Sequence, residues 1–211
     1  MPSQHVAILN SGGLRSLVAT ALTCSSGEKL RITLLHVLDG RENTATRLEY
    51  VRRQAEFFSI YHVHEIKMPH LFGHGFGKSP TGEPMGTLAS AQILIAALGH
   101  ARFNQAEKII WPASFNCEPK AMAKATEQIL LCEHLAQIEG SPMPALNDPL
   151  LEMTDQQIIE LGGQLQVPWR LAWSCTNQNK SPCRTCPACR RRKNAFEKAG
   201  VIDPVEKLVT V

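Results

Sequence analysis

Four cysteines near the end of the chain have the type and spacing of a metal site. Cys175, Cys183, Cys186 and Cys189 follow the pattern C-x7-C-x2-C-x2-C. Thiolates separated by two residues can curl round one ion in a tight turn, and a fourth thiolate from a flanking loop completes a tetrahedron. Four sulfur ligands leave no position for water, so the spacing predicts a structural zinc ion. An iron–sulfur cluster and two disulfides are the alternatives, because each also uses four cysteines.

The cellular compartment bears on the disulfide alternative. The sequence shows no signal peptide and no long apolar run, so we expect a cytoplasmic chain without a membrane contact, where disulfides are rare. The other thiols, Cys24, Cys117 and Cys132, lie in apolar or helical contexts. We interpret them as buried, inert side chains.

A second chemical signal lies near the start of the chain. The apolar run at residues 5–9 leads directly into Asn10-Ser11-Gly12-Gly13-Leu14-Arg15-Ser16, and the helical pattern LVATALTC follows. Strand, glycine loop and helix together build an anion site, since glycines let the backbone approach a phosphate and the helix N-terminus adds a positive dipole. The loop therefore indicates phosphate binding, with a simple tight turn as the alternative.

Further strands and helices must hold these two signals in place. Short apolar runs predict four more strands at residues 31–37, 61–66, 108–111 and around Leu146. Periodic segments predict helices at residues 46–58, 87–103, 119–139 and 154–161. This alternation implies an α/β fold with a parallel five-stranded sheet and helices on both faces, and ligands of such sheets collect at the carboxyl ends of the strands. We expect an α/β domain with the glycine loop at residues 1–165 and a cysteine segment at residues 166–211 packed on it.

Local signals predict where the helices end and what they cover. Thr46-Arg47-Leu48-Glu49 and Thr154-Asp155-Gln156-Gln157 fit capping boxes, which mark helix starts. Gly162-Gly163 is expected to end the later helix. The helix at residues 87–103 is apolar nearly all round, so it should be buried or cover a subunit interface, which would make a homodimer. The glycine-rich stretch at residues 67–86 predicts a flap over the site.

The composition is that of an ordinary globular protein. Of the 211 residues, 44% are hydrophobic and 19% are charged, which provides enough apolar material for a core. A net charge of +3 does not by itself argue for nucleic acid. The cationic run Arg190-Arg191-Arg192-Lys193 would spread round a helix, so we interpret it as a solvated face, with nucleic-acid binding as the alternative.

With both signals located, the sequence resembles a known family, the 7-cyano-7-deazaguanine synthases of the queuosine pathway, within the N-type ATP pyrophosphatases. Pro168-Trp169 followed by Leu171-Ala172-Trp173-Ser174-Cys175 is similar to the family pattern V-P-x-x-L-T-W-S-C. The resemblance continues through Thr154, Ile158, Leu161 and Gly162, and through Pro182, Cys183, Cys186, Cys189, Arg190, Ala195, Phe196, Ala199, Gly200, Asp203 and Pro204. It runs from about residue 6 to residue 203 and is stronger after residue 147.

The resemblance implies a half-Rossmann sheet of the adenine nucleotide alpha hydrolase type, with a PP-loop for ATP and a four-cysteine zinc beside the active cleft. ATP would lie with its phosphates against Ser11, Gly12, Gly13 and Ser16. The carboxylate of 7-carboxy-7-deazaguanine would attack the α-phosphate to form an acyl adenylate, ammonia would displace AMP to give an amide, and activation with loss of water would give a nitrile. The protein would mainly position reactants and neutralise charge. Arg15 and Ser16 are the candidate catalytic residues.

The sequence departs from the family pattern in three places. The family loop reads S-G-G-x-D-S, and Arg15 stands here at the acidic position, so a magnesium contact is replaced by a cation that could grip a phosphate. The family stretch P-G-R-N corresponds to Pro84-Met85-Gly86-Thr87. Its acidic segment after the fourth strand corresponds to residues 113–120, where Glu118 is the only acid. The motifs for metal and phosphate are altered, whereas those for the fold remain.

Three hypotheses for the function follow. The first is an ATP-dependent ligase that acts on 7-carboxy-7-deazaguanine or a related carboxylate. The second is a protein that binds a nucleotide without turnover and serves a partner enzyme. The third is a nucleic-acid-directed modification protein. We favour the first because the C-terminal motifs match closely, while a fold alone does not guarantee its chemistry.

Overall fold

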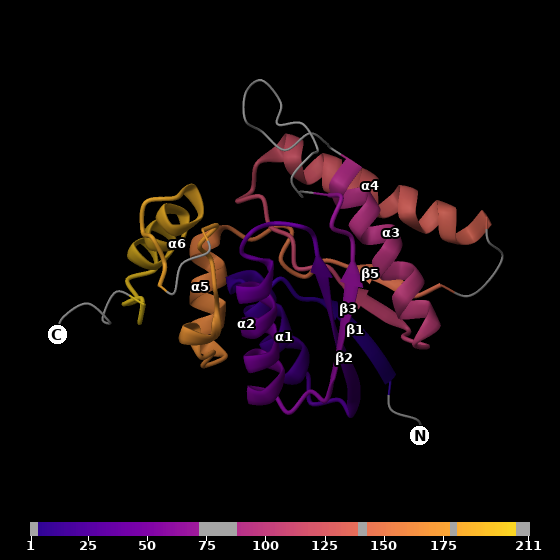
Figure 1. The fold of residues 1–211 in the computed structure, drawn as a ribbon, viewed down its shortest axis with the longest axis horizontal. Coiled ribbons are helices and arrows are strands. Elements are labelled where there is room, and N and C mark those ends of the chain that lie inside the picture. Colours follow the sequence, from indigo (N-terminus) through magenta and orange to yellow (C-terminus); the bar gives the residue numbers. More distant parts are fainter. Residues whose placement is uncertain (1–3, 72–87, 139–142, 178–180, 206–211) are drawn as a thin grey trace.

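The fold consists of strands and helices that alternate along the chain. The computed structural model describes residues 4–71, 88–138, 143–177 and 181–205 (Figure 1). The elements are β1 (Gln4–Leu9), α1 (Leu14–Cys24), β2 (Leu30–Leu38), α2 (Thr44–Phe57), β3 (His62–Lys67), α3 (Leu88–Phe103), β4 (Lys108–Ile110), α4 (Pro119–Ile138), β5 (Ala145–Asn147), α5 (Asp155–Gln164), the 3-10 helix η1 (Trp169–Leu171) and α6 (Pro187–Lys198). Most of the expected flap, and the stretch that corresponds to P-G-R-N, lie outside the described residues.

The five strands form one parallel sheet in the order β3-β2-β1-β4-β5, which confirms the predicted fold class. Parallel neighbours need crossover connections, and here helices make them. Helices α1 and α2 cover one face, and α3 and α4 cover the other (Figure 1). β1 is central because its run of apolar residues is suited to burial on both faces.

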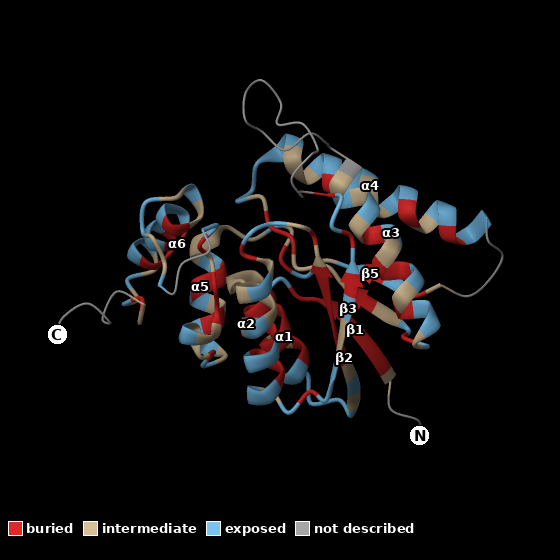
Figure 2. Cartoon of the chain, viewed as in Figure 1, coloured by how far each residue is buried: buried red, intermediate tan, exposed pale blue. Residues whose placement is uncertain are grey.

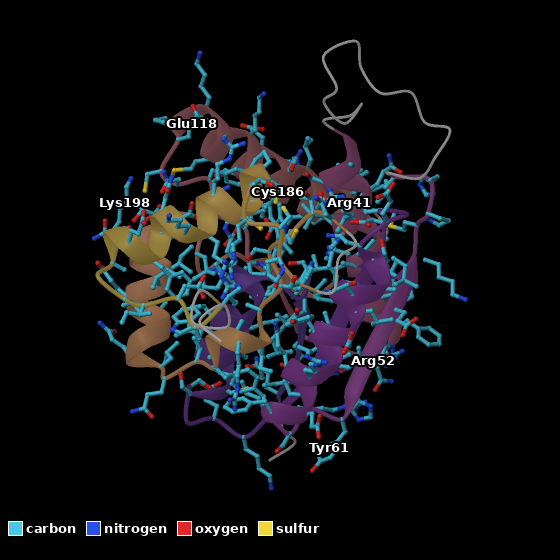
Figure 3. All side chains as sticks on the ribbon, turned by 60° about the vertical axis from the view of Figure 1, so that its left-hand side comes forward. Arg41, Arg52, Tyr61, Glu118, Cys186 and Lys198 are labelled. Atoms are coloured by element: carbon cyan, nitrogen blue, oxygen red, sulfur yellow. The ribbon has the colours of Figure 1, made fainter. Side chains whose placement is uncertain are left out.

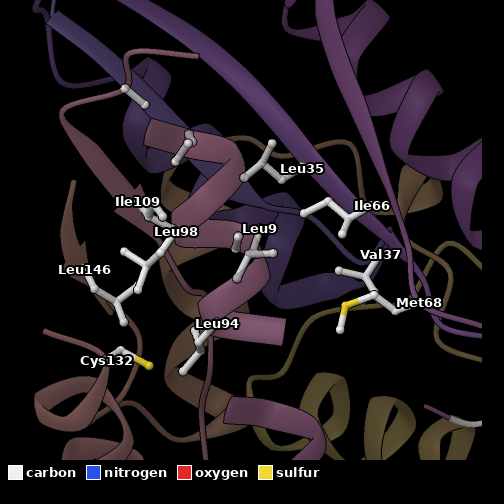
Figure 4. Close-up of a cluster of buried hydrophobic side chains, with 14 of the residues drawn as sticks. Leu9, Leu35, Val37, Ile66, Met68, Leu94, Leu98, Ile109, Cys132 and Leu146 are labelled. Carbon is white, nitrogen blue, oxygen red and sulfur yellow. The ribbon is translucent and has the colours of Figure 1, made fainter. Parts of the chain in front are cut away.

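Alternate side chains of β1 supply the cores on the two faces of the sheet. Val6 and Ile8 pack in one cluster with Val51 of α2. Leu9 points to the opposite face and belongs to the cluster that includes Leu94 of α3, which Figure 4 shows. Successive side chains of a strand point to opposite faces, so a single strand holds both helical layers. The buried residues accordingly concentrate in the sheet and on the sheet-facing sides of the helices (Figure 2).

Helix α3 buries one stripe rather than its whole surface. Leu94, Ala97, Leu98 and Ala101 are buried, whereas Ile95 is 48% exposed. The sheet can cover only one side of a helix, which explains the difference. Self-association through this helix stays a prediction.

The two predicted capping boxes have different outcomes. At α5 the box is confirmed, since Thr154 Oγ1 accepts a hydrogen bond from Gln157 N at 3.2 Å and Gln157 Oε1 accepts one from Thr154 N at 2.8 Å. At α2 the prediction is wrong, because the helix begins at Thr44 and Thr46 lies inside its first turn. The N–H of Thr44 already donates to the carbonyl of Arg41 at 3.0 Å, so the chain turns earlier than the pattern suggested.

Helix α5 does not end at Gly162-Gly163 as expected but continues to Gln164. A Cβ atom on Gly162 would lie 2.2 Å from the ring of Trp169. This glycine therefore admits a tryptophan ring against the helix and does not end it.

The cationic run on α6 is not a uniform solvated face. Arg192 is 6% exposed, and its Nε donates to Asp203 Oδ2 at 2.6 Å while its Nη1 donates to the carbonyl of Ala172 at 2.6 Å. The other three side chains of the run also have partners within the chain. The surface interpretation is wrong for Arg192, which ties α6 to the segment before the cysteines.

The thiols outside the C-terminal cluster are also only partly as expected. Cys132 is buried, as predicted, but Cys24 and Cys117 are exposed, so the prediction is wrong for those two. The division into residues 1–165 and 166–211 stays a prediction. Among the described helices, none has the length and apolar character needed to cross a membrane.

Candidate active site and cysteine cluster

The loop at residues 10–16, between β1 and α1, is closed by its own side chains. Buried Asn10 accepts a hydrogen bond from Gly12 N at 2.8 Å through Oδ1 and donates to Gln54 Oε1 at 2.9 Å through Nδ2. Ser16 Oγ accepts a hydrogen bond from Ser11 N at 3.0 Å and lies 3.0 Å from Ser11 Oγ. The two serines and the asparagine thus fix the loop. The catalytic role of Ser16 stays a prediction.

A glycine is required at position 12 for two reasons. Its φ of +75° lies in the left-handed region, and a Cβ atom there would stand 2.6 Å from the carbonyl oxygen of Arg47. That close approach lets Arg47 Nε donate to the carbonyl of Ser11 at 3.1 Å. Helix α2 is therefore in direct contact with the loop.

A neutral histidine supports the same loop from inside the sheet. His36 lies on β2 and is fully buried, and its Nδ1 is 2.7 Å from the carbonyl oxygen of Asn10. A carbonyl can only accept, so Nδ1 carries the proton. Burial lowers the pKa of His36 to about 4, which keeps the ring uncharged near neutral pH. His36 thus orients the first peptide of the loop without adding charge.

A cavity of about 370 Å³ opens between this loop and the C-terminal segment, and we call it the larger cavity. Four helices begin at its wall, represented by Gly13 before α1, Asn43 before α2, Asp155 at the start of α5 and Ala188 in the first turn of α6. Each helix N-terminus contributes a positive partial charge. Their convergence makes the cavity favourable for an anion, and phosphate binding by the loop stays a prediction.

An ion-paired cluster of three side chains forms one side of the larger cavity. Arg15 Nη2 donates to Asp155 Oδ1 at 3.2 Å, and Arg191 binds both oxygens of Asp155, with Nη2 3.0 Å from Oδ1. Burial alone would raise the pKa of Asp155, but the hydrogen bonds and charges of Arg191 and Arg15 lower it below its usual value. The carboxylate therefore stays ionised and holds two guanidinium groups beside the loop.

A second pair of arginines approaches the larger cavity from the end of β2. Arg47 Nη1 donates to buried Asp39 Oδ2 at 2.7 Å, and Arg41 Nε lies 3.6 Å from the same oxygen. Figure 3 turns the left-hand side of Figure 1 forward and labels Arg41 and, in the cysteine segment, Cys186. The larger cavity is thus surrounded by guanidinium groups from four different helices and loops.

A smaller cavity of about 170 Å³ lies beside the first, at the carboxyl ends of β1 and β2. Its wall is largely apolar and includes Leu35, Val37 and Trp111. The two cavities share Ser11, Arg47 and Pro112. One elongated ligand with a flat apolar part and an anionic part could therefore occupy both.

Hydrogen bonds attach the C-terminal segment directly to the loop. Trp173 N donates to the carbonyl of Gly12 at 2.8 Å, and Asn43 Nδ2 donates to the carbonyl of Cys175 at 2.8 Å. The ring of Trp173 also packs against Tyr50 with centroids 5.3 Å apart. The tail with the cysteines thus lies beside the loop and forms part of the cavity wall.

The four cysteines of the C-terminal segment come together as the spacing predicted. The Sγ atoms of Cys175, Cys183, Cys186 and Cys189 all lie within 4.8 Å of one another. Backbone N–H groups donate to three of these sulfurs at 3.4 Å, an arrangement that stabilises thiolates. All seven cysteines of the chain are described and none forms a disulfide. Tetrahedral metal–sulfur bonds of about 2.3 Å require sulfurs about 3.8 Å apart, so the cluster could hold a metal ion.

Several cavity residues were not identified from the sequence. Arg41 and Arg47 follow the second strand at its carboxyl end, where the topology of a parallel sheet could have indicated them. The sequence patterns indicate Asp155 only as part of a helix cap and Arg191 only as part of a cationic run. Glu118, the acid noted after the fourth strand, accepts a hydrogen bond from Ala121 N at 2.6 Å and caps α4.

Solved structures with the same fold are distant in sequence. The NMN synthetase from Francisella tularensis has a TM-score of 0.54 and 17% identity, with 95% of this chain and 89% of that one covered. The U34-tRNA thiolase NcsA from Methanococcus maripaludis, solved with its 4Fe-4S cluster, has a TM-score of 0.53 and 12% identity, with 99% and 73% covered. At these identities the likeness concerns the fold alone.

Sequence comparisons are more specific. The family model of the Queuosine biosynthesis protein QueC matches residues 96–200. The 7-cyano-7-deazaguanine synthase from Chlorobium limicola is 30% identical over 219 residues, which cover 94% of this chain and 95% of the relative. The synthase from Chlorobium phaeobacteroides is 29% identical over 217 residues with the same coverage. The chain therefore belongs to the 7-cyano-7-deazaguanine synthase family.

Proposed function

We propose that this protein is an ATP-dependent ligase of the 7-cyano-7-deazaguanine synthase type, which adenylates the carboxylate of 7-carboxy-7-deazaguanine and converts it with ammonia to the amide and the nitrile. Membership of the family supports this reaction class. The observation that carries the proposal is the larger cavity, where four helix N-termini and several arginines meet beside the loop at residues 10–16. A carboxylate becomes reactive only when its oxygen is phosphorylated, and the transfer develops negative charge that such donors stabilise.

The two cavities suggest how ATP would lie. The adenine would enter the smaller, apolar cavity near Leu35 and Val37, and the phosphates would extend past Ser11 into the larger cavity. There the N–H groups at the start of α1 have no side-chain cap, since Gly13 precedes the helix. Those groups and Arg47 would bind phosphate oxygens. The carboxylate substrate would take the remaining space toward Trp173 and the cysteine segment.

The cysteine cluster fits a single ion better than a multi-iron cluster. In a cluster the cysteines bind different irons and stand farther apart than ligands that share one ion. Four thiolates within 4.8 Å match one tetrahedral ion, and we propose zinc. With all four positions taken by sulfur, zinc would stabilise the tail rather than supply a reactive water.

The test is an AMP-release assay. The protein is incubated with ATP, magnesium, ammonium and 7-carboxy-7-deazaguanine, and AMP and the nitrile are measured by chromatography and mass spectrometry. We expect AMP only when the carboxylate is present. Arg47→Gln should lower kcat/KM by about 100-fold, because one arginine at a transferring phosphoryl group is worth a few kcal/mol. Arg52→Gln, on the same helix but paired with Glu65 at the surface, should leave it unchanged.

One observation favours a second candidate, a nucleotide-binding protein without turnover. Arg15 occupies the position at which the family loop carries an acid, and its guanidinium group is held by Asp155. If saturable nucleotide binding is found with no AMP from 7-carboxy-7-deazaguanine or related carboxylates, the ligase proposal is wrong and this second candidate replaces it.

A further inference from the structure

A magnesium ion finds few free oxygen ligands in this site. Magnesium prefers carboxylate and phosphate oxygens in a near-octahedral arrangement. The carboxylate of Asp155 is the only one among the described residues that line the larger cavity, and arginines occupy both of its oxygens. In the smaller cavity Asp39 accepts hydrogen bonds from Arg47 Nη1, Thr44 Oγ1 and the N–H of Arg41. The donor set therefore does not fit the metal that the fold family implies.

A third carboxyl group nearby does not change this conclusion. Asp148 follows β5, lies close enough to Arg15 to feel its charge, and binds Leu150 N through Oδ1 at 3.1 Å. Burial raises the pKa of Asp148 to about 7, so near neutral pH a proton competes with any cation for this group. Across residues 4–71, 88–138, 143–177 and 181–205, the only grouping of three or more metal-binding side chains is the four cysteines.

Guanidinium groups supply the positive charge that a magnesium ion would otherwise bring to the phosphates. Arg15 and Arg191 have side chains 29% and 47% exposed, and their N–H groups that do not contact Asp155 have no other hydrogen-bond partner among the described residues. A guanidinium has five donors in a planar fork that suits phosphate oxygens. Among the described residues that line the larger cavity, arginines outnumber carboxylates by five to one: Arg15, Arg41, Arg47, Arg191 and Arg192 against Asp155.

We propose that Arg15 and Arg191, held together by Asp155, neutralise the phosphates of the bound nucleotide in place of a divalent cation. The nucleotide then binds without magnesium. This inference rests on the nucleotide site proposed above. It adds that Arg15, at the acidic position of the family loop, replaces the charge of the metal and does not abolish the site. The ligand class is a nucleoside triphosphate, whose phosphates carry the charge that both guanidinium groups meet.

The test is calorimetric titration with α,β-methylene-ATP, which cannot release pyrophosphate. The parent protein is titrated in a buffer with excess EDTA and in a buffer with excess magnesium. We expect a Kd in EDTA that is equal to, or lower than, the Kd with magnesium, because magnesium on the ligand would repel the arginines.

Substitutions then assign the effect to the two arginines. Arg15→Gln and Arg191→Gln should each raise the Kd in EDTA by about 10-fold or more, as expected for the loss of a charge-assisted hydrogen bond. Arg15→Asp should bind poorly in EDTA and recover with magnesium, because it restores a carboxylate at the loop. Arg52→Gln removes a surface arginine paired with Glu65 and should have no effect. Circular dichroism spectra like the parent's would show that each variant is folded.

The outcomes separate this inference from the proposed function. If the parent binds at least about 10-fold more tightly with magnesium than in EDTA, the inference is wrong while the ligase proposal stands. If binding is independent of magnesium but no AMP forms in the turnover assay, the inference stands and the ligase proposal fails. No binding in either buffer would overturn both.

Discussion

A half-buried carboxyl group just after β5 gives a pH dependence that can be tested. Asp148 Oδ2 is buried without a partner among the described residues, and burial raises the pKa of this group from 3.8 to about 7. The folded state therefore holds a proton that the unfolded state has released between these values, so the free energy of unfolding falls as pH rises from about 4 to about 7. We predict that Asp148→Asn removes this loss.

The expected effect is modest because the residue is partly exposed. After a discount for solvent screening, the gain at about pH 8 is about 1 kcal/mol. This corresponds to a Tm higher by about 2–4 °C for a chain of this size. Thermal unfolding followed by circular dichroism at about pH 4 and about pH 8 measures it, with the exposed Glu160→Gln as the control. A difference between parent and variant that does not grow with pH would contradict the argument.

Burial of individual residues could be predicted only in part from the sequence. The glycine pattern predicted a phosphate loop, but it did not indicate that Ser11 bonds to Ser16 or that Gly12 makes room for the carbonyl of Arg47. Arg192 could not be recognised inside its cationic run, because its partners Asp203 and Ala172 are brought to it by the tertiary fold. A local pattern contains no information on such partners.

At the scale of single elements, the two glycines of α5 allow a paired test. In Gly162→Ala the new Cβ atom would meet the ring of Trp169 at 2.2 Å and Val18 Cγ2 at 2.9 Å, so overpacking should cost about 1–3 kcal/mol. In Gly163→Ala nothing lies within 4 Å, and the gain in helix propensity should stabilise by about 0.5–1 kcal/mol. Urea unfolding measures both. If the free energy of unfolding changed in the same direction in both variants, packing against Trp169 would not explain why position 162 is a glycine.

The elements themselves were largely predictable, because strands and helices leave periodic patterns. All five strands and their alternation with helices are confirmed, with ends that differ by a few residues. The exceptions have tertiary causes. Helix α5 continues through its glycines because Trp169 packs there, and α3 leaves Ile95 exposed because the sheet covers one side only.

For the whole molecule, the cysteine cluster should stabilise the tail and, through it, the larger cavity. We predict that Cys186→Ser lowers the bound metal, measured by mass spectrometry, and lowers the Tm, because metal-binding energy in such sites is folding energy. Nucleotide affinity should fall as well, since the carbonyl of Cys175 and the N–H of Trp173 are bonded to the residues beside the loop. Cys117→Ser alters an exposed thiol outside the cluster and is the matched control. Equal Tm with and without a chelator would refute the prediction.

The arrangement of the site depends on the whole molecule and was only partly predictable. The family resemblance correctly implied that the cysteine segment lies beside the first loop. The pairing of Arg15 and Arg191 through Asp155 required three segments that only the fold brings together, so no spacing in the sequence could indicate it.

The bond between Trp173 and Gly12 has a consequence for synthesis of the protein. A nascent chain emerges from the ribosome with residues 10–16 first and residue 173 much later. The bond from Trp173 to the loop can therefore form only after most of the chain has been translated. Contacts between distant parts of a chain form slowly, because a long loop must be closed before they stabilise anything. Fragments that lack the final segment would therefore hold most of the sheet but only an open, incomplete anion site.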